Sequence, residues 1–270
     1  MSFQEKEIKA FYHGYEDRIA DKRWKSKYAL RAYAHKMQYE SVLSYVRPGV
    51  KVLDAGCGDG VLSLMMARKG AAVTGVDLSS PNIESALRRA KESGITNTSF
   101  IVGDVENLPF EDSSFDLVVS SHVLEHVPDF DKGLREVMRV ARKRAIVAIP
   151  TVVNPCSWVQ VGGGWYYLKG LRSFLALPAG FILMTASYLT CKEGVDEGYV
   201  GSGMPHVFRF VRVMKGKIRT LGFRLVGYEA SSVCLPYFAS LLPLIKFMDK
   251  YKNKPILRNC GYGTTFVIEK

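Results

Sequence analysis

The chain has 270 residues, of which 47% are hydrophobic and 23% are charged. These proportions are close to those of folded soluble proteins, so they exclude disordered, collagen-like and disulfide-scaffold classes. The five cysteines are scattered and lack C-x-x-C spacing, which argues against a disulfide framework or a structural zinc site. No apolar run follows the polar N-terminus, so no secretory signal peptide is predicted. We therefore expect a cytoplasmic, folded protein.

The formal net charge of +11 is distributed unevenly. Residues 1–50 carry 10 basic and 6 acidic groups, residues 51–150 carry 12 and 14, and residues 151–270 carry 15 and 6. From Arg209 to Arg224, six basic residues occur with no acid among them. This pattern suggests an anionic partner, namely a phosphorylated substrate, a membrane surface or a nucleic acid, although a solvated basic face would have the same composition.

Residues 50–150 alternate short apolar runs with helical patterns, which is typical of βαβ units. Ser80 followed by Pro81 predicts the start of a crossover helix, and Gly94 predicts its end. Strands are predicted at Lys51–Ala55, Ala72–Asp77, Thr98–Val102, Phe115–Ser120 and Arg144–Ile149. A doubly wound α/β sheet is therefore expected.

Four segments are expected along the chain. An aromatic and glycine-rich stretch, including residues 162–167, interrupts the α/β rhythm and predicts an inserted cap. The segments are an N-terminal helical segment (1–49), the core (50–150), the cap (151–205) and a C-terminal completion of the sheet with an apolar insertion (206–270). The last segment is predicted to hold a helix with Val207, Val211, Met214, Ile218 and Leu221 on one face, then strands at Phe223–Glu229 and Thr264–Glu269.

The cap contains 18 residues without a charge, from Phe174 to Cys191. A membrane span normally needs ~20 predominantly apolar residues. Because Pro178 and Gly180 interrupt this stretch, we expect a buried or interfacial cap segment rather than a transmembrane helix.

A glycine-rich loop follows the first predicted strand, in the run from Asp54 to Gly60. Glycine permits a tight turn and lets a ligand approach the backbone, and the helix that follows offers unpaired N–H groups. Dinucleotide sites need G-x-G-x-x-G, but Val61 stands where the third glycine would be, which disfavours an oxidoreductase. The loop therefore predicts a nucleoside-type cofactor.

Carboxylates stand at the ends of the first three predicted strands. Asp77 could accept both hydroxyls of a ribose, and Asp104 could accept an exocyclic amino proton from adenine. Each alone would more often be a loop or capping residue, but together with Asp54 they indicate a nucleoside site.

Five stretches in this order resemble the class I, seven-stranded S-adenosylmethionine-dependent methyltransferases. They are residues 52–60, 76–79, 103–110, 115–118 and 124–127. The resemblance implies a mostly parallel, Rossmann-like sheet of seven strands with the last one antiparallel. It also implies that S-adenosyl-L-methionine is the cofactor.

The resemblance further implies how the cofactor is held. Its methionine part would lie over Gly56 to Gly58, with Ser121 near the methionine end, and its ribose would contact Asp77. The adenine would lie between Leu78 and Val105, with Asp104 at the amino group.

Methyl transfer from a sulfonium depends mainly on alignment, and a general base matters only for a protonated acceptor such as a hydroxyl. His122 and His206 are the candidate bases, whereas His126 is expected to be structural. Ubiquinone-type O-methyltransferases, which this stretch resembles, carry Glu-x-x-Glu-His and a later histidine that can hold a metal. Here the first glutamate is replaced by His122, so no metal is predicted.

We therefore expect a methyltransferase for a small or lipid-linked acceptor, with O-methylation favoured. The alternative is a module that binds the cofactor without catalysis and acts as a partner protein. Two apolar stretches flanked by basic residues, Phe174–Leu189 and Leu235–Met248, favour peripheral contact with the inner face of a membrane, but a buried cap around a soluble acceptor remains open. A nucleic-acid partner is not expected, because no aromatic residue lies between Arg212 and Arg219.

Overall fold

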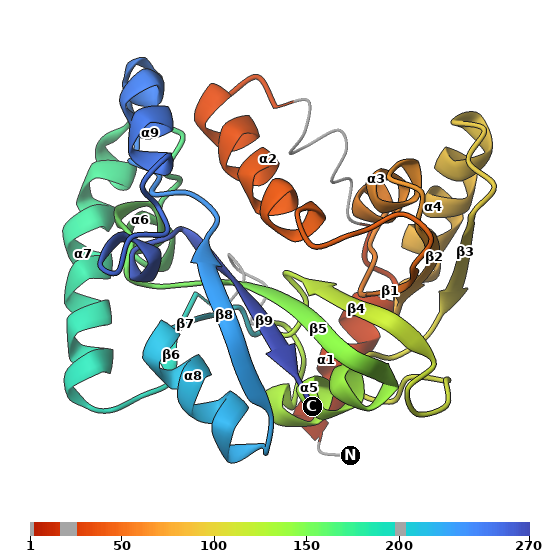
Figure 1. Ribbon diagram of the computed structural model, residues 1–270. Coiled ribbons are helices and arrows are strands. Elements are labelled where there is room, and N and C mark those ends of the chain that lie inside the picture. Colours follow the sequence, from red (N-terminus) through yellow and green to blue (C-terminus); the bar gives the residue numbers. More distant parts are fainter. Residues whose placement is uncertain (1–2, 17–25, 198–203) are drawn as a thin grey trace.

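The computed structural model describes residues 3–16, 26–197 and 204–270 (Figure 1). Its main feature is one sheet made of β1 (Lys51–Ala55), β2 (Ala72–Asp77), β3 (Thr98–Val102), β4 (Phe115–Ser121), β5 (Ala141–Pro150), β8 (Arg224–Ala230) and β9 (Gly263–Glu269). The strand order is β3-β2-β1-β4-β5-β9-β8. The pairs among β1 to β5 are parallel, and β9 is antiparallel to both of its neighbours. The predicted seven-stranded sheet with an antiparallel last strand is confirmed.

The sheet is buried on both faces because its strands alternate between two apolar layers. Along β5, Val147 and Ile149 belong to one layer, whereas Ile146 and Ala148 belong to the other. The helices α5 (Phe130–Val140) and α8 (Val211–Thr220) cover the first face, and α2 (Ala29–Leu43) and α3 (Val61–Arg68) cover the second. A smaller cluster packs α4 (Ser80–Glu92) against β3. This two-sided burial is the doubly wound arrangement.

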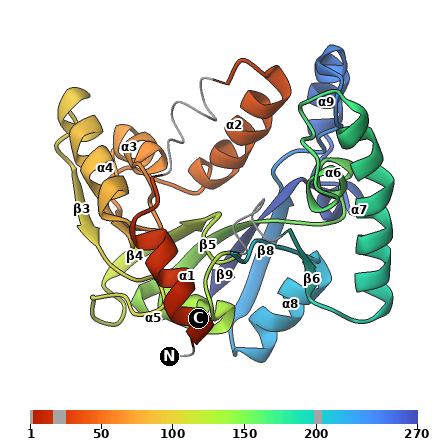
Figure 2. The same ribbon diagram turned by 180° about the vertical axis from the view of Figure 1, so that it is seen from behind.

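The N-terminal helix α1 (Phe3–His13) lies over the carboxyl ends of the strands, in front of β4 and α5 in Figure 2. Lys9 of this helix contacts Asp104, just beyond β3, and Tyr12 contacts His126, between β4 and α5. The N-terminal segment is helical as predicted, except that residues 17–25 lie outside the described part of the chain.

Two of the predicted helix starts differ in the structure. Ser79, not Ser80, caps α4, because its extended backbone lets its hydroxyl accept a hydrogen bond from the Asn82 N–H at 3.2 Å. Val207 lies in the short strand β7 (Val207–Arg209), which pairs with β6 (Gly194–Asp196), and α8 begins only at Val211. Helical spacing that includes Val207 cannot reveal a strand partner from another part of the chain.

The cap packs two helices through a seam of small residues. Helix α6 (Pro155–Val161) meets α7 (Leu171–Leu189) where Gly162 and Ala176 touch and where Gly180 faces the Trp158 carbonyl. Beyond the cap, α9 (Leu242–Asp249) lies between the short turns η2 (Ala239–Leu241) and η3 (Leu257–Asn259).

Helix α7 begins three residues before the uncharged run predicted from the sequence, and most of it is exposed. Among the described residues, α7 is the one helix whose length and composition would let it cross a membrane. Only 22% of its most apolar 18-residue window is buried.

The close packing of α6 against α7 at Gly162, Ala176 and Gly180, here called the glycine seam, leads to a testable prediction. Replacing glycine by alanine inside a helix normally stabilises by ~1 kcal/mol, but a Cβ on Gly180 would lie 1.8 Å from the Trp158 carbonyl oxygen. We expect Gly180→Ala to lower the free energy of unfolding by about 1–3 kcal/mol through overpacking. The matched control is Gly216→Ala in α8, where a Cβ meets nothing within 4 Å. Urea unfolding should show a loss for the first variant and no loss for the second, and equal effects would contradict the seam.

Candidate functional site

A cavity of about 510 Å³ lies at the carboxyl ends of the parallel strands, where ligands of doubly wound sheets bind. Its walls come from the loops after β1, β2, β3 and β4, from α1 and α2, and from the cap. Nine of the ten residues predicted for the site line it, namely Gly56, Gly58, Asp77, Leu78, Asp104, Val105, Ser121, His122 and His206.

The glycine loop turns at two glycines whose backbone is left-handed. Gly56 has φ +87°, and a Cβ there would lie 2.2 Å from Cγ2 of Val123. Gly58 has φ +53°, which is also the left-handed region. The N–H groups of Gly56 and Cys57 both donate to the Val76 carbonyl, at 2.7 and 2.9 Å. These bonds tie the loop to β2 and leave bare backbone on the cavity wall.

The Asp77 carboxylate is oriented by the loops on both sides of it. Oδ2 accepts the Gly58 N–H at 2.8 Å, and Oδ1 accepts the Ser79 N–H at 2.9 Å and Nδ2 of Asn82 at 3.2 Å. The same side chain therefore holds the glycine loop and presents oxygen atoms at the cavity wall. Such a preorganised carboxylate suits a pair of ligand hydroxyl donors.

Asp104 is paired with a residue that the sequence analysis did not select. Nζ of Lys9 lies 2.6 Å from Oδ2 of Asp104 and 2.9 Å from Oε2 of the buried Glu106. Burial acts to lower the pKa of Lys9, but the hydrogen bonds to the two carboxylates outweigh it and raise the pKa. Helix α1 thus closes this end of the cavity with a charged contact, and a ligand donor that reaches Asp104 has to share it with Lys9.

Asp54 is the predicted residue that does not line the cavity. Its carboxylate is buried behind the glycine loop, where it accepts a hydrogen bond from Oγ of Ser63 at 2.5 Å. Burial raises the pKa of Asp54 to about 7, although the Ser63 hydrogen bond opposes the shift. This position supports the loop from within rather than contacting a ligand in the cavity.

His122 forms a pair with a buried carboxylate. Its backbone is left-handed, with φ +58°, and its N–H donates to the Ala148 carbonyl at 2.8 Å. Nδ1 of the ring lies 3.2 Å from Oε1 of Glu125. Burial would raise the pKa of Glu125, but the hydrogen bond from His122 and the nearby histidines lower it to about 2. Glu125 therefore stays ionised and holds the His122 ring in place.

Two further histidines lie beside this pair. The rings of His126 and His206 stack with centroids 4.6 Å apart, Tyr12 Oη lies 3.0 Å from His126 Nδ1, and Glu197 Oε2 lies 2.7 Å from His206 Nδ1. His126, expected to be structural, thus lies on the cavity wall.

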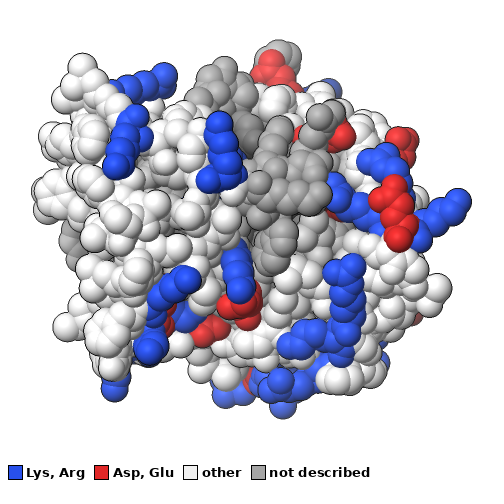
Figure 3. All heavy atoms as spheres, turned by 90° about the horizontal axis from the view of Figure 1, so that it is seen from above, with Lys and Arg blue, Asp and Glu red and all other residues white. Residues whose placement is uncertain are grey.

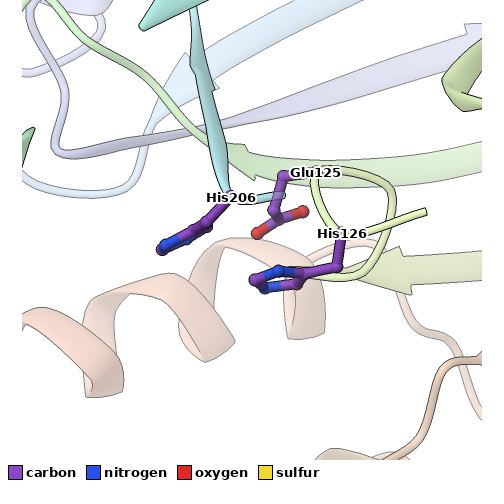
Figure 4. Close-up of side chains that lie close together, drawn as sticks. All are labelled: Glu125, His126 and His206. Carbon is purple, nitrogen blue, oxygen red and sulfur yellow. The ribbon is translucent and has the colours of Figure 1, made fainter. Parts of the chain in front are cut away.

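Glu125, His126 and His206 point toward one another in Figure 4, and their ligand atoms all lie within 4.8 Å of each other. Two imidazoles with one carboxylate would suit zinc or iron better than magnesium. These residues could hold a metal ion, and the expectation that none is bound stays a prediction.

The far wall of the cavity is aromatic and comes largely from the cap. Cap residues cannot be assigned to a site from sequence, because only packing brings their loop against α2 and against Tyr262, just before β9. Arg31 of α2 adds a cation there, with Cζ 4.8 Å from the ring centre of Tyr167. The aromatic residues of this wall are Trp165, Tyr166, Tyr167, Phe208 and Tyr262.

Comparison with known proteins identifies the central part of the chain. A family profile described as "Methyltransferase domain" matches residues 47–161. A "Ubiquinone biosynthesis O-methyltransferase" of Paracidovorax citrulli is 37% identical over 137 residues, which are 49% of this chain and 50% of that protein. A "Malonyl-[acyl-carrier protein] O-methyltransferase" of Serratia marcescens is 31% identical over 169 residues, which are 63% of this chain and 64% of that protein.

A solved structure matches over almost the whole chain. The magnesium protoporphyrin IX methyltransferase of Synechocystis PCC 6803 with bound SAH has a TM-score of 0.56 and 17% identity, and the match covers 99% of this chain and 93% of that one. At this identity the likeness supports the fold alone. The chain spans about half the length of the first relative named above.

The buried Asp54 generates a prediction about pH. Because its pKa is raised in the folded state, the free energy of unfolding falls as pH rises from ~4, where the unfolded carboxyl ionises, to about 7. Over this whole pH range the free energy of unfolding falls by about 4 kcal/mol. Asp54→Asn keeps an acceptor for Ser63 but does not titrate. Urea unfolding at pH 5 and pH 8 should therefore show wild type losing ~2 kcal/mol more than the variant. Parallel pH profiles would mean that the carboxyl is solvated.

Proposed function

We propose that this chain, whose residues 47–161 form a class I S-adenosylmethionine-dependent methyltransferase domain, transfers a methyl group from S-adenosyl-L-methionine to a small or lipid-linked acceptor. One observation carries the proposal. Bare glycine backbone, the oriented Asp77 carboxylate and the His122–Glu125 pair line a single cavity.

The cavity suits this cofactor part by part. Gly56 and Gly58 line the cavity without side chains, which leaves room there for the methionine portion. Asp77 offers oxygen atoms to the two ribose hydroxyls. Three further assignments remain part of the proposal: Leu78 and Val105 on the adenine faces, Asp104 at the adenine amino group, and Ser121 at the methionine end.

The cofactor supplies a methyl group on a positively charged sulfur. The protein's main task is then to hold the acceptor atom in line with that group and to exclude water. The aromatic wall, with Tyr166 and Phe208 buried in it, supplies an apolar environment for the acceptor.

His122 is the proposed general base for a hydroxyl acceptor. Ionised Glu125 accepts the Nδ1 proton of His122, which leaves Nε2 as the basic nitrogen. Nε2 is buried and has no hydrogen-bond partner among the described residues, so it is available to take the acceptor's proton. His206, paired with Glu197 in the same way, is the second candidate base.

The acceptor class is proposed from the relatives and from the surface. Both named relatives are O-methyltransferases, which supports transfer to oxygen. The apolar, basic cap supports a lipid-linked acceptor met at the cytoplasmic face of a membrane, and offers little for base recognition in a nucleic acid.

Cofactor binding tests the proposal directly. Asp77→Ala should weaken S-adenosylhomocysteine binding by at least ~1.5 kcal/mol, roughly tenfold, because charge-assisted hydrogen bonds to the ribose are lost. Isothermal titration calorimetry measures this, with Asp116→Ala at the opposite end of the strands as the control. Wild type should not bind NAD. Unchanged affinity in Asp77→Ala would overturn the placement of the cofactor, and binding without turnover would favour a non-catalytic module.

Proton removal by His122 makes a separate prediction. With a hydroxyl acceptor, His122→Gln should lower kcat by about 10²–10³-fold while S-adenosylhomocysteine affinity stays unchanged. The assay follows labelled methyl transfer to a panel of phenols and carboxylates, with His13→Gln, an exposed residue of α1, as the control. A carboxylate acceptor needs no base, so its methylation should not depend on His122. Equal activity of wild type and His122→Gln on hydroxyl acceptors would assign the base to another residue.

A further inference from the structure

The outer face of α7 and α9 is a continuous apolar surface. On α7 the exposed residues Leu171, Leu175, Ile182 and Leu189 are spaced four, seven and seven positions apart, so they lie along one side of the helix. Large apolar side chains are also exposed on α9 and in the turns after it. We define the outer face by Leu171, Leu175, Ile182 and Leu189 of α7 and by Leu244, Phe247, Tyr251 and Ile256 in and after α9.

The opposite side of α7 is fixed to the protein. Gly180 lies so close to the Trp158 carbonyl that α7 and α6 pack backbone against backbone. Two hydrogen bonds also tie α7 to other segments of the protein. Tyr237 Oη donates to the Ser173 carbonyl, and Ser187 Oγ donates to the Gly194 carbonyl, both at 2.5 Å. A helix held along one side in this way can lie on a membrane but is not free to cross it.

Helix α9 is anchored from beneath by one buried acid. The carboxylate of Asp249 accepts hydrogen bonds from Tyr33 Oη at 2.8 Å, from Ser232 Oγ at 2.7 Å and from the Val233 N–H at 2.7 Å. These bonds fix the inner side of α9, so its apolar residues Leu244 and Phe247 stay outside. Figures 1 and 2 both show α9 beside one end of α7.

The charges around the outer face are almost all positive. Residues 151–192 contain no acid, and residues 230–262 contain only Asp249, which is buried. In Figure 3 the left part of the view, over α7 and α9, is mostly white, whereas blue and red side chains lie together on the right. The exposed basic residues near the outer face are Lys169, Arg172, Lys192, Lys246, Lys250 and Lys254.

We propose that the outer face docks on an anionic lipid bilayer, with α7 lying in the plane of the interface. Apolar side chains would enter the acyl boundary while lysines and arginines meet the headgroups, as in membrane-surface helices. A second copy of this chain fits the outer face less well, because the positive charges of the two copies would face and repel one another.

The docking surface also offers a route by which the acceptor reaches the cavity. This route rests on the proposed function. Residues 162–170 join α6 to α7, and within them Trp165, Tyr166 and Tyr167 line the cavity. The loop therefore connects the outer face to the proposed acceptor wall. An amphiphilic acceptor could pass from the bilayer to the cavity along it.

Vesicle co-sedimentation tests the docking. The full chain is mixed with phosphatidylcholine vesicles that contain about 30% phosphatidylglycerol, or none, at about 100 and about 500 mM salt. The test variant, Leu175→Glu with Ile182→Glu, places two acids on α7 side chains that are 61% and 65% exposed. The matched control, Leu87→Glu with Val226→Glu, places two acids on exposed residues of α4 and β8. S-adenosylhomocysteine affinity, measured on each preparation, tests the proposed function separately.

We expect wild type to bind anionic vesicles at low salt, with weaker binding at high salt or without phosphatidylglycerol. The α7 variant should bind at least about tenfold more weakly, and the control should bind within about twofold of wild type. Failure of wild type to sediment, or an equal loss in the control, would overturn the docking whatever the cofactor affinity. A wild-type dimer that the α7 variant dissociates, without vesicle binding, would assign the outer face to a second copy.

Discussion

The close contact between the glycine loop and the rest of the sheet edge is the constraint on which the site depends. Gly56 must turn sharply against Val123 while its N–H bonds to Val76. Asp77 holds the same loop through Gly58, and the buried Asp54 supports it from behind. Because these contacts are satisfied within the protein, the loop presents backbone rather than side chains to the cavity. The shape of this part of the cavity wall is therefore held by contacts within the protein.

The same edge of the sheet also positions several ionisable side chains. The loop after β4 carries His122 and Glu125, and its left-handed turn at His122 keeps the two in contact. Chain segments from outside the core then close the cavity, with Lys9 from α1 on one side and His206, just after the cap, on the other. Part of the cavity wall thus comes from segments outside residues 47–161, the part of the chain that matches the methyltransferase domain profile.

Much of the fold could be predicted because it is encoded over short distances. Short apolar runs predict β1, β2 and β3 with their observed bounds, and the acids that end the strands identify one sheet edge. Errors arose at two helix starts, one decided by a distant strand partner and the other by the backbone conformation of a single residue. Val207 pairs with β6 instead of continuing a helix, and the hydroxyl that caps α4 belongs to Ser79 instead of Ser80. Neither helical spacing nor a Ser-Pro pair shows at which residue a helix begins in these two cases.

The sequence by itself determined the core sheet, the glycine loop and the carboxylates beside it, because each follows from local backbone chemistry. Only the tertiary structure decided which side chains meet across the chain. It paired Lys9 with Asp104, stacked His126 on His206, and moved Asp54 away from the cavity wall. It also decided that α7 turns its apolar stripe outward, because the glycine seam occupies its other side. Such pairings depend on packing free energy summed over many contacts, and no local pattern contains that sum.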